Sequence, residues 1–478
     1  MKIAMVASEA APFVKTGGLG DVLQALPQAL SEIKNNEVSV FIPFYDRIKY
    51  SGKYDVEFLG YFDVPLAWRR EYVGLLRLKS RRKKLKIYFI DNEHYFCRGA
   101  LYGEYDDGER FAFFCKAVID LLPSLDWMPD ILHCNDWQTA LVPIYLKDVA
   151  TRWPEVRGIR TVFTIHNIEY QGRYGADSVD QLFGLDRGWY DDGTLRMDGD
   201  VNLMKGAMLM ADAVTTVSPT YAAQLHDPRY AEGLGSVVDA IGWKMHGVVN
   251  GIDTVGYDPA SDPALPAHYT PEDMGGKAVC KSSLQGALGL HQEPDTPLIA
   301  MVTRLVGHKG LDLVQQAMDG IMATGCQFVV LGTGDRQYED FFRWKAGQYP
   351  GRLSAQILYA EDLSRRVYAA ADLFLMPSRS EPCGLSQMIA MRYGAVPIVR
   401  STGGLADTVK SCQVGQSDGT GYLFGDYDAG AMLSVIGQAT GLYRGDRAGF
   451  DTVRQRGMTE DFSWTRSADS YRHIYENL

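Results

Sequence analysis

The chain has 478 residues and a formal net charge of −11, with 46% hydrophobic and 22% charged residues. A single hydrophobic core seldom grows beyond about 250–300 residues, so this length predicts two domains. The negative charge argues against a broad nucleic-acid surface, but it is compatible with a local basic pocket for a phosphorylated ligand. The basic run within 79–86 is expected to be a solvated approach to a strand rather than a polyanion site.

The cysteines and the apolar runs indicate the compartment. Seven cysteines are scattered along the chain without a C-x-x-C pair, which predicts a reducing environment and neither a disulfide framework nor a zinc site. Glu9 and Lys15 interrupt the first apolar run, so we expect no signal-peptide core. No uninterrupted apolar stretch is long enough to cross a bilayer. We therefore expect a cytoplasmic protein with no membrane partner.

Strand-like and helix-like segments alternate along nearly the whole chain, which is typical of βαβ units around parallel sheets. In the first half we expect strands at 2–7, 38–42, 85–90, 131–134, 160–165 and 213–217, and helices at 19–30, 110–122 and 203–211. In the second half we expect strands at 298–302, 327–331, 354–358, 373–376 and 395–399, and helices at 311–323, 364–370 and 385–393.

A stretch rich in Gly, Pro and Asp follows the segment 249–253 and predicts a boundary near 248–256. We therefore expect a first domain over 1–248 and a second domain over 249–460. A final helix within 461–478 is expected to pack back on the first domain.

The string Thr-Gly-Gly-Leu-x-Asp occurs twice, at 16–21 and at 402–407, and each copy follows an expected strand. Paired glycines at a strand-to-helix turn let backbone N–H groups approach an anion. A single turn of this kind is often a plain connection. Two copies in a long α/β chain predict two similar halves, each of which presents a loop to one shared cleft.

The segment 378–386 combines a carboxylate, a glycine turn and the start of a helix directly after an apolar strand. In open α/β sheets, ligands bind at the carboxyl ends of the strands. Glu381 is a candidate acceptor for sugar hydroxyls, and the N–H groups of Gly384, Leu385 and Ser386 are a candidate anion site. The alternative is an ordinary helix cap, in which Ser386 or Glu381 satisfies free amides.

Arg304 and Lys309 lie in a glycine-containing turn between an expected strand and a helix. Two cations in this position suit a diphosphate, because Arg can bind two oxygens while Lys acts as a point charge. No metal-binding carboxylate cluster accompanies them in the sequence, so we expect these cations to stabilise a leaving phosphate in place of Mg²⁺. The alternative is a pair of solvated loop residues. Lys15 is a candidate third cation from the other half.

Two polar clusters, at 133–138 and 164–167, each end an apolar strand of the first half. A lone strand-end histidine is usually structural, but two clusters at neighbouring strand ends are better explained by the wall of a site. Asp136 and His166 are candidates for binding sugar hydroxyls, and Trp137 could offer an apolar face to a pyranose.

Several other enzyme classes lack their motifs here. The turn 331–335 is not a dinucleotide fingerprint, because Gln337 occupies the last glycine position, and no P-loop string is present. These absences argue against a dehydrogenase and a P-loop nucleotidase. No Gly-x-Ser-x-Gly elbow occurs, and Cys383 is expected to line a pocket rather than act as a nucleophile.

Together these motifs resemble the bacterial glycogen synthases and plant starch synthases, which are retaining glucosyltransferases with two facing Rossmann-like domains (the GT-B fold). The matching strings follow the order of the family over almost the whole chain, at 15–21, 135–138, 163–167, 213–221, 249–253, 304–310, 377–385 and 401–409. The resemblance implies an α/β fold with an interdomain cleft, an acceptor-binding first domain and a nucleotide-sugar-binding second domain.

The resemblance also implies the reaction, which is transfer of glucose from ADP-glucose to the nonreducing 4-hydroxyl of an α-1,4-glucan, with retention. ADP-glucose, ADP and glycogen or maltooligosaccharides would be the ligands, and no metal, cofactor, nucleic acid or membrane would take part. The oligomeric state is not implied. Two alternatives remain open: a transferase that uses UDP-glucose or makes a small glucoside, and a catalytically silent glucan-binding protein.

The resemblance assigns roles residue by residue. Its catalytic residues would be Lys15, His166, Arg304, Lys309 and Glu381, with the three cations on the diphosphate. Tyr359 would stack on the adenine, and Glu9 and Tyr95 would contact the acceptor. The other substrate-binding residues would be Gly17, Gly18, Asp21, Asp136, Trp137, Gln138, Asn167, Asn250, Gly332, Gly334, Cys383, Gly384, Leu385 and Ser386.

The chain departs from related transferases at several positions. Ile389 stands where many of them carry a second glutamate, and Asn135 stands where many family members carry histidine. Retention requires either a covalent intermediate or attack on the same face as the leaving phosphate. Without an obvious second carboxylate, we expect same-face attack, in which the departing phosphate oxygen helps to deprotonate the acceptor hydroxyl.

Overall fold

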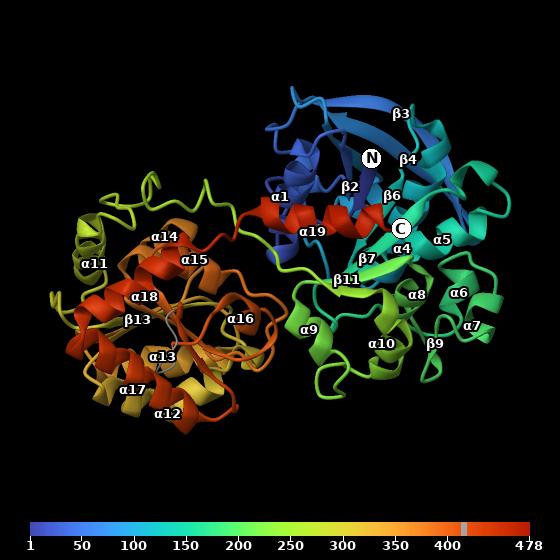
Figure 1. Ribbon diagram of the computed structural model, residues 1–478. Helices are drawn as coiled ribbons and strands as arrows, with labels where there is room; N and C mark the ends of the chain where they lie inside the picture. Colours follow the sequence, from blue (N-terminus) through green and yellow to red (C-terminus); the bar gives the residue numbers. More distant parts are fainter. Residues whose placement is uncertain (413–417) are drawn as a thin grey trace. The chain divides into compact units, whose positions relative to one another are not determined.

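A computed structural model describes residues 1–412 and 418–478, and the chain divides into two compact units (Figure 1). Unit 1 contains Met1–Val217, Ala222–Val248 and Trp464–Leu478, and unit 2 contains Ser218–Tyr221 and Val249–Ser463. Each unit has its own sheet of mainly parallel strands with helices packed against it. Across the described ranges, no helix is long and apolar enough to cross a membrane.

The sheet of unit 1 is parallel through most of its width. Its strands are β1 (Lys2–Val6), β2 (Glu37–Pro43), β3 (Val56–Leu66), β4 (Arg69–Leu78), β5 (Leu85–Asp91), β6 (Ile131–Asn135), β7 (Arg160–Ile165), β11 (Ala213–Thr216) and β12 (Met245–Gly247). Their order is β12-β11-β7-β6-β1-β2-β5-β4-β3, and every pair from β12 to β5 is parallel. The central strands β1 and β6 are buried almost throughout, as expected for strands covered on both faces.

The antiparallel ribbon β3–β4 is absent from the predicted elements. It extends the sheet beyond β5, and β3 alternates between exposed and partly buried residues over most of its length. Phe58, Tyr61 and Tyr72 are exposed on this ribbon. A ribbon with one face in water lacks the continuous apolar run by which buried parallel strands are recognised.

Two helices of unit 1, from opposite ends of the chain, lie side by side. Helix α1 (Gly18–Glu32) buries Leu23, Leu26 and Leu30, and α19 (Trp464–Glu476) packs along it (Figure 1). The Tyr475 hydroxyl of α19 lies 2.6 Å from Nδ1 of buried His133, so the last helix is joined to the central strand β6. Further helices in the first half are α4 (Asp107–Leu121), α5 (Leu141–Val149), α8 (Leu203–Met210), α9 (Pro219–Gln224) and α10 (Gly235–Ile241).

The short elements of the first half are the helices α2 (Asp46–Lys49), α3 (Glu93–Phe96), α6 (Ser178–Gln181) and α7 (Gly188–Asp191), and the strands β8 (Arg173–Tyr174), β9 (Arg196–Met197) and β10 (Asp200–Asn202). The three short strands form a separate antiparallel sheet in the order β8-β10-β9.

The described residues of unit 2 form a sheet of six parallel strands. They are β13 (Leu298–Val302), β14 (Gln327–Leu331), β15 (Leu353–Gln356), β16 (Leu373–Met376), β17 (Val396–Arg400) and β18 (Tyr422–Phe424). Their order is β15-β14-β13-β16-β17-β18. Strands β13, β14 and β16 have the predicted bounds, because each is a short segment that is apolar throughout or, in β14, after its first residue Gln327.

The helices of unit 2 were predicted less completely. Helices α12 (Leu311–Ala323), α14 (Glu361–Ala370) and α15 (Ser386–Arg392) match predicted segments, and α16 (Gly403–Thr408) is the short helix of the second repeated string. Helices α11 (Gly275–Ala287), α13 (Arg336–Gln348), α17 (Ala429–Gly445) and α18 (Arg447–Thr459) were not predicted. Helix α17 contains four glycines, each of which disfavours a helix by about 1 kcal/mol, so its buried face rather than its propensity supports it.

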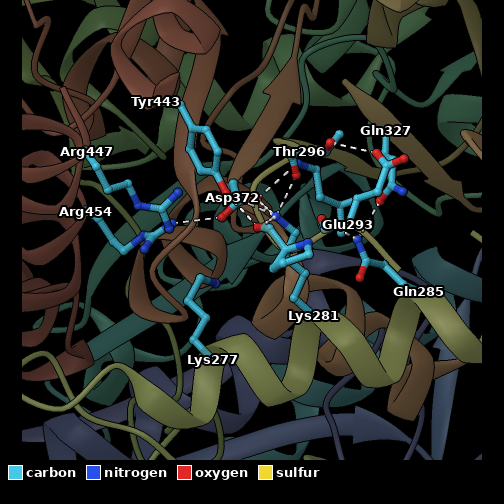
Figure 2. Close-up of polar contacts among 12 residues, drawn as sticks. Lys277, Lys281, Gln285, Glu293, Thr296, Gln327, Asp372, Tyr443, Arg447 and Arg454 are labelled. Carbon is cyan, nitrogen blue, oxygen red and sulfur yellow. Dashed lines mark hydrogen bonds and ion pairs between the residues drawn. The ribbon is translucent and has the colours of Figure 1, made fainter. Parts of the chain in front are cut away.

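A buried ion network joins two of these helices to the amino end of strand β16 in the middle of the sheet (Figure 2). Asp372 lies directly before β16, and its carboxylate accepts hydrogen bonds from Lys281 of α11 at 2.7 Å, Arg454 of α18 at 2.9 Å and the Leu298 N–H at 3.0 Å. Burial raises the pKa of Asp372, but the charges of Lys281 and Arg454 outweigh burial and hold this pKa below its usual value. Asp372 therefore pairs with two buried cations, of which Arg454 also pairs with Asp451 at 2.8 Å.

We predict that Asp372→Asn lowers the free energy of unfolding by about 3–5 kcal/mol, because it removes the carboxylate that pairs with buried Lys281 and leaves Arg454 paired with Asp451 alone. Asp340→Asn is the control, since Asp340 forms exposed ion pairs with Arg336 and Arg343 whose loss should change stability by about 1 kcal/mol or less. Urea denaturation at pH 7 measures both variants. Equal, small losses in the two variants would contradict this view of the network.

The depressed pKa of Asp372 also sets the sign of the pH dependence. Because the folded-state pKa lies below the unfolded value of about 3.9, the carboxylate stabilises the fold at neutral pH. This contribution is lost as the pH falls through the folded-state pKa.

Candidate active site

The predicted site residues of unit 1 follow three adjacent parallel strands. The Lys15 loop follows β1, Asp136 follows β6 and His166 follows β7. Because the carboxyl ends of neighbouring parallel strands share one edge of the sheet, the structure brings these segments to the same edge of unit 1.

Asp136 holds the backbone of the next strand end. Its carboxylate accepts the His166 N–H at 2.8 Å and also the Asn167 N–H. The Asp136 backbone has a φ of 56°, a left-handed conformation that is rare outside glycine and often marks a functional site. Burial raises the pKa of Asp136 to about 7, against the opposing effect of the two amide donors.

The imidazole of His166 is neutral, and its tautomer follows from its neighbour. Burial lowers the pKa of His166 to about 3. Its Nε2 lies 2.9 Å from Oδ1 of Asn135, whose Nδ2 donates to the Val6 carbonyl. Since Oδ1 of Asn135 is an acceptor, Nε2 of His166 carries the proton and Nδ1 is the unprotonated nitrogen. His166 can therefore accept a hydrogen bond from a hydroxyl at Nδ1, but it cannot supply positive charge.

The amides of the first Gly-Gly turn face a carboxylate of the protein itself. Glu9, which is 1% exposed, accepts the N–H groups of Thr16 at 2.8 Å, Gly20 at 3.1 Å and also Gly17. The Gly17 N–H, which was expected to approach a ligand anion, therefore binds a carboxylate of the protein in this structure. The Lys15 ammonium pairs with Asp21 at 2.7 Å, and both side chains are about one-third exposed.

Three other predicted residues of unit 1 are enclosed by their neighbours. Tyr95 is fully buried, and its hydroxyl donates to Glu109 at 2.6 Å. The Trp137 ring packs against Phe111 and Tyr174. Gln138 is buried, and within the described residues its Oε1 has no hydrogen-bond partner. The structure therefore gives Tyr95 and Trp137 packing contacts, while Gln138 keeps an unused acceptor.

The other two predicted residues of unit 1 are Gly18, which is the first residue of α1, and Asn167, whose side chain accepts the Glu169 N–H.

Apart from Asn250, the predicted site residues of unit 2 follow four neighbouring strands, β15, β14, β13 and β16. The central contact is an ion pair between Lys309 and Glu381, with 2.7 Å between Nζ and Oε2 and with both side chains largely buried. The hydroxyl of Ser378 donates to the same oxygen of Glu381 at 3.0 Å. Ser378 was not among the predicted site residues, although its position at a strand end, three residues before Glu381, could have identified it. Arg304 is exposed.

Glycines let two further loops approach Glu381. A Cβ atom at Gly310 would lie 2.0 Å from the Pro377 carbonyl oxygen, and one at Gly403 would lie 1.9 Å from that of Glu381. Both residues have positive φ angles, 74° and 46°. The Gly404 N–H donates to the Glu381 carbonyl at 3.1 Å. In this structure the Gly404 amide of the second Gly-Gly turn therefore binds the protein backbone.

Gly332 and Gly334 allow the turn after β14 to pass close to the backbone on either side of Arg304. A Cβ atom at Gly332 would lie 1.8 Å from the Thr303 carbonyl oxygen, and one at Gly334 would lie 2.3 Å from that of Leu305. The Leu305 N–H donates to Thr333 at 2.9 Å across the same contact. These glycines bring the β14 turn against the β13 turn, so the structure gives them an indirect part in placing Arg304.

Asn250 and Cys383 form a buried contact near Glu381. Burial raises the pKa of the Cys383 thiol to about 12, although the Asn250 N–H binds its sulfur, and a neutral thiol at pH 7 argues against a nucleophilic role. Asn250 is 7% exposed, and in the part of the chain that the structure describes its Oδ1 has no hydrogen-bond partner. A buried acceptor without a donor is costly, which makes Oδ1 of Asn250 a candidate acceptor for a ligand hydroxyl.

The remaining predicted residues lie at the same edge of the sheet of unit 2. Tyr359, after β15, is 83% exposed. Gly384 has a φ of 74°, Leu385 precedes α15, and the Ser386 hydroxyl binds that of Tyr368. Over residues 1–412 and 418–478, no three His, Cys, Asp or Glu side chains form a candidate metal site.

Comparisons with known proteins agree with this arrangement. Residues 2–240 match a family model described as the starch synthase catalytic domain, and residues 290–439 match glycosyl transferases group 1. Curated glycogen synthases from Streptococcus equi subsp. zooepidemicus, Streptococcus mutans and Ligilactobacillus salivarius are 46%, 45% and 44% identical, with 100% of each chain covered.

Solved structures show the same similarity. The catalytic domain of starch synthase IV from Arabidopsis thaliana, bound to ADP and acarbose, is 35% identical and superimposes with a TM-score of 0.91 over 99% of this chain and 98% of that one. A sucrose-phosphate synthase from Thermosynechococcus elongatus is 17% identical with a TM-score of 0.60 over 100% of this chain and 98% of that one, which shows a common fold alone. The chain therefore belongs to the starch synthase family of retaining glycosyltransferases and has the two-domain α/β GT-B fold that its sequence predicted.

Proposed function

We propose that this protein is a glycogen synthase that transfers glucose from ADP-glucose to the nonreducing 4-hydroxyl of an α-1,4-glucan, with retention. Full-length similarity to curated glycogen synthases supports the reaction class, and the related starch synthase IV binds ADP and acarbose. The observation that carries the proposal is the Lys309–Glu381 ion pair at the carboxyl edge of the unit 2 sheet.

Unit 2 supplies groups that suit each part of the donor. Lys309 has three N–H donors, and Glu381 engages one of them, so the others can address phosphate oxygens. Arg304 adds a second cation for the diphosphate. The unused Oδ1 of Asn250 suits a sugar hydroxyl, and the exposed ring of Tyr359 suits the adenine.

In unit 1, the groups at the strand ends beside the Lys15 loop are polar, but they carry no positive charge. His166 accepts a sugar hydroxyl at Nδ1 and is neutral, so it does not act as a general acid. In the proposed step, the bond from the anomeric carbon to the diphosphate breaks while the acceptor O4 bonds to that carbon on the same face. The departing phosphate takes the acceptor proton. Lys15, Arg304 and Lys309 stabilise the growing charge on the diphosphate.

The proposal assigns the acceptor to a first domain of residues 1–248 with 461–478, and the nucleotide sugar to a second domain of residues 249–460. Side-chain cations carry the electrostatic role, so the proposed reaction needs neither a metal nor a cofactor. All seven cysteines lie in the described ranges and are free thiols, which supports a reducing compartment, the cytoplasm.

The direct test of the function is incorporation of radiolabelled glucose from ADP-glucose into glycogen. We expect primer-dependent incorporation, and hydrolysis of the product by an α-1,4-specific glucosidase confirms the linkage and its anomeric configuration. Incorporation from UDP-glucose but not from ADP-glucose would contradict the donor, and an absence of incorporation from both would contradict the activity.

We predict that Lys309→Ala lowers kcat roughly 100-fold or more, because loss of one group that stabilises the leaving charge typically costs about 3–4 kcal/mol. Arg343→Ala is the matched control, since it removes an exposed cation of unit 2 that pairs with Glu339 and Asp340. Steady-state kinetics with ADP-glucose measure both variants. A kcat/KM for Lys309→Ala equal to that of the unmodified protein would rule out its assigned role.

The raised pKa of Asp136 predicts an acid limb in the pH–rate profile with a midpoint near pH 7. Above this pH the carboxylate is charged and holds the His166 and Asn167 amides, and below it protonation weakens that contact. Asp136→Asn should have low activity without this limb. An unchanged limb in Asp136→Asn would assign it to another group.

The same shift of the Asp136 pKa has the opposite effect on stability. Between the unfolded pKa of about 3.9 and the folded value near 7, the folded protein binds the proton more tightly, so stability decreases as the pH rises through this window.

A further inference from the structure

The carboxylate of Glu9 is fully engaged by the loop that carries Lys15. Oε2 accepts both the N–H and the hydroxyl of Thr16, at 2.8 and 2.7 Å, and Oε1 accepts the Gly20 N–H at 3.1 Å. Glu9 is 1% exposed, so its carboxylate is closed off from solvent. Both oxygens therefore bind donors of the protein's own loop, whereas the family resemblance assigns Glu9 to the acceptor.

The contacts of Glu9 fix the Lys15 side chain from two sides. Thr16 is the next residue along the chain, so its two hydrogen bonds set the backbone at Lys15. A Cβ atom at Gly20 would lie 3.0 Å from both Cβ and Cγ of Lys15, which shows that the stem of Lys15 lies against Gly20. The Ala11 N–H donates to the Gly20 carbonyl at 3.0 Å and closes the loop.

Stability does not explain a carboxylate in this position. Burial raises the pKa of Glu9, even though the donors of Thr16, Gly20 and Gly17 lower it. A carboxyl group whose pKa is higher in the folded state makes its ionisation unfavourable to folding. The charged form therefore orders the loop at a cost to overall stability, which is typical of functional positions.

We propose that Glu9 is a positioning residue, whose buried carboxylate holds the loop of Lys15 so that the Lys15 ammonium meets the donor diphosphate. This inference rests on the proposed function, because it assigns Lys15 to the diphosphate of ADP-glucose. It assigns Glu9 a part in donor binding and turnover instead of a contact with the acceptor.

The test is a double-mutant cycle with Glu9→Gln, Lys15→Ala and the combined variant. Glutamine keeps the shape of the side chain, but its NH₂ group would face an N–H or O–H donor of the loop. We expect Glu9→Gln to lower kcat about 10–100-fold, as for a misplaced catalytic group, and to weaken ADP binding in calorimetry. The KM for glucan should be unchanged. The combined variant should be no worse than Lys15→Ala, because Glu9 acts through Lys15.

Two results would overturn the proposal. A raised KM for glucan with normal ADP binding in Glu9→Gln would show that Glu9 contacts the acceptor. Multiplying effects of the two substitutions would show that Glu9 acts independently of Lys15. If the unmodified protein neither binds ADP nor transfers glucose from ADP-glucose, the proposed function fails together with this inference, whereas an additive cycle in an active enzyme overturns the inference alone.

Two further variants keep the test independent of folding defects. Asp120→Asn removes another buried carboxylate of unit 1, which pairs with Lys116 on α4, and should leave kcat and both KM values unchanged. Thr16→Val removes one hydroxyl donor and leaves Glu9 in place, so it should reproduce the Glu9→Gln pattern to a smaller degree. Wild-type kinetics in a folded Thr16→Val together with a kinetic defect in Asp120→Asn would contradict the positioning role.

Discussion

A buried glutamate fixes a lysine-bearing loop in each unit of this protein. Glu9 accepts backbone N–H groups from Thr16, which follows Lys15, and from Gly20, which lies against the Lys15 side chain. Glu381 binds the ammonium of Lys309 directly. Hydrogen bonds to a charged carboxylate away from water are stronger than neutral ones, so both loops are ordered before a ligand arrives. Fixed cations need little reorganisation when charge develops on a leaving phosphate, which makes such order useful for catalysis.

The repeated Thr-Gly-Gly-Leu-x-Asp string serves this purpose in two different ways. In the first copy, the turn donates its amides to the side chain of Glu9. In the second copy, Gly403 and Gly404 bring the turn against the main chain of Glu381. In the second copy glycine is required because the backbone passes close to Glu381 and Cys383, whereas a Cβ atom at Gly17 of the first copy would meet no atom within 4 Å. In each unit the turn therefore contacts one of the protein's own glutamates.

The sequence predicted those parts of the fold that depend on local pattern. Strands β13, β14 and β16 were predicted to the residue because buried parallel strands are continuous apolar runs. The ribbon β3–β4 was not predicted, because one of its faces is exposed to solvent. Helix α17 was not predicted either, because tertiary packing stabilises it despite its glycine-rich sequence. The strand-end positions of Asp136, His166 and Glu381 were predicted for the same reason as the strands. The loop contacts of Glu9 and the burial of Tyr95 were not predicted, because they depend on how loops fold back on the sheet.

The most direct test of this account is a pair of crystal structures, one without ligand and one with ADP. The account predicts that Glu9 keeps its bonds to Thr16 and Gly20, and that Glu381 keeps Lys309 and Ser378, in both structures. Displacement of either carboxylate from its loop when ADP binds would contradict the claim that these glutamates set the positions of the cations in advance.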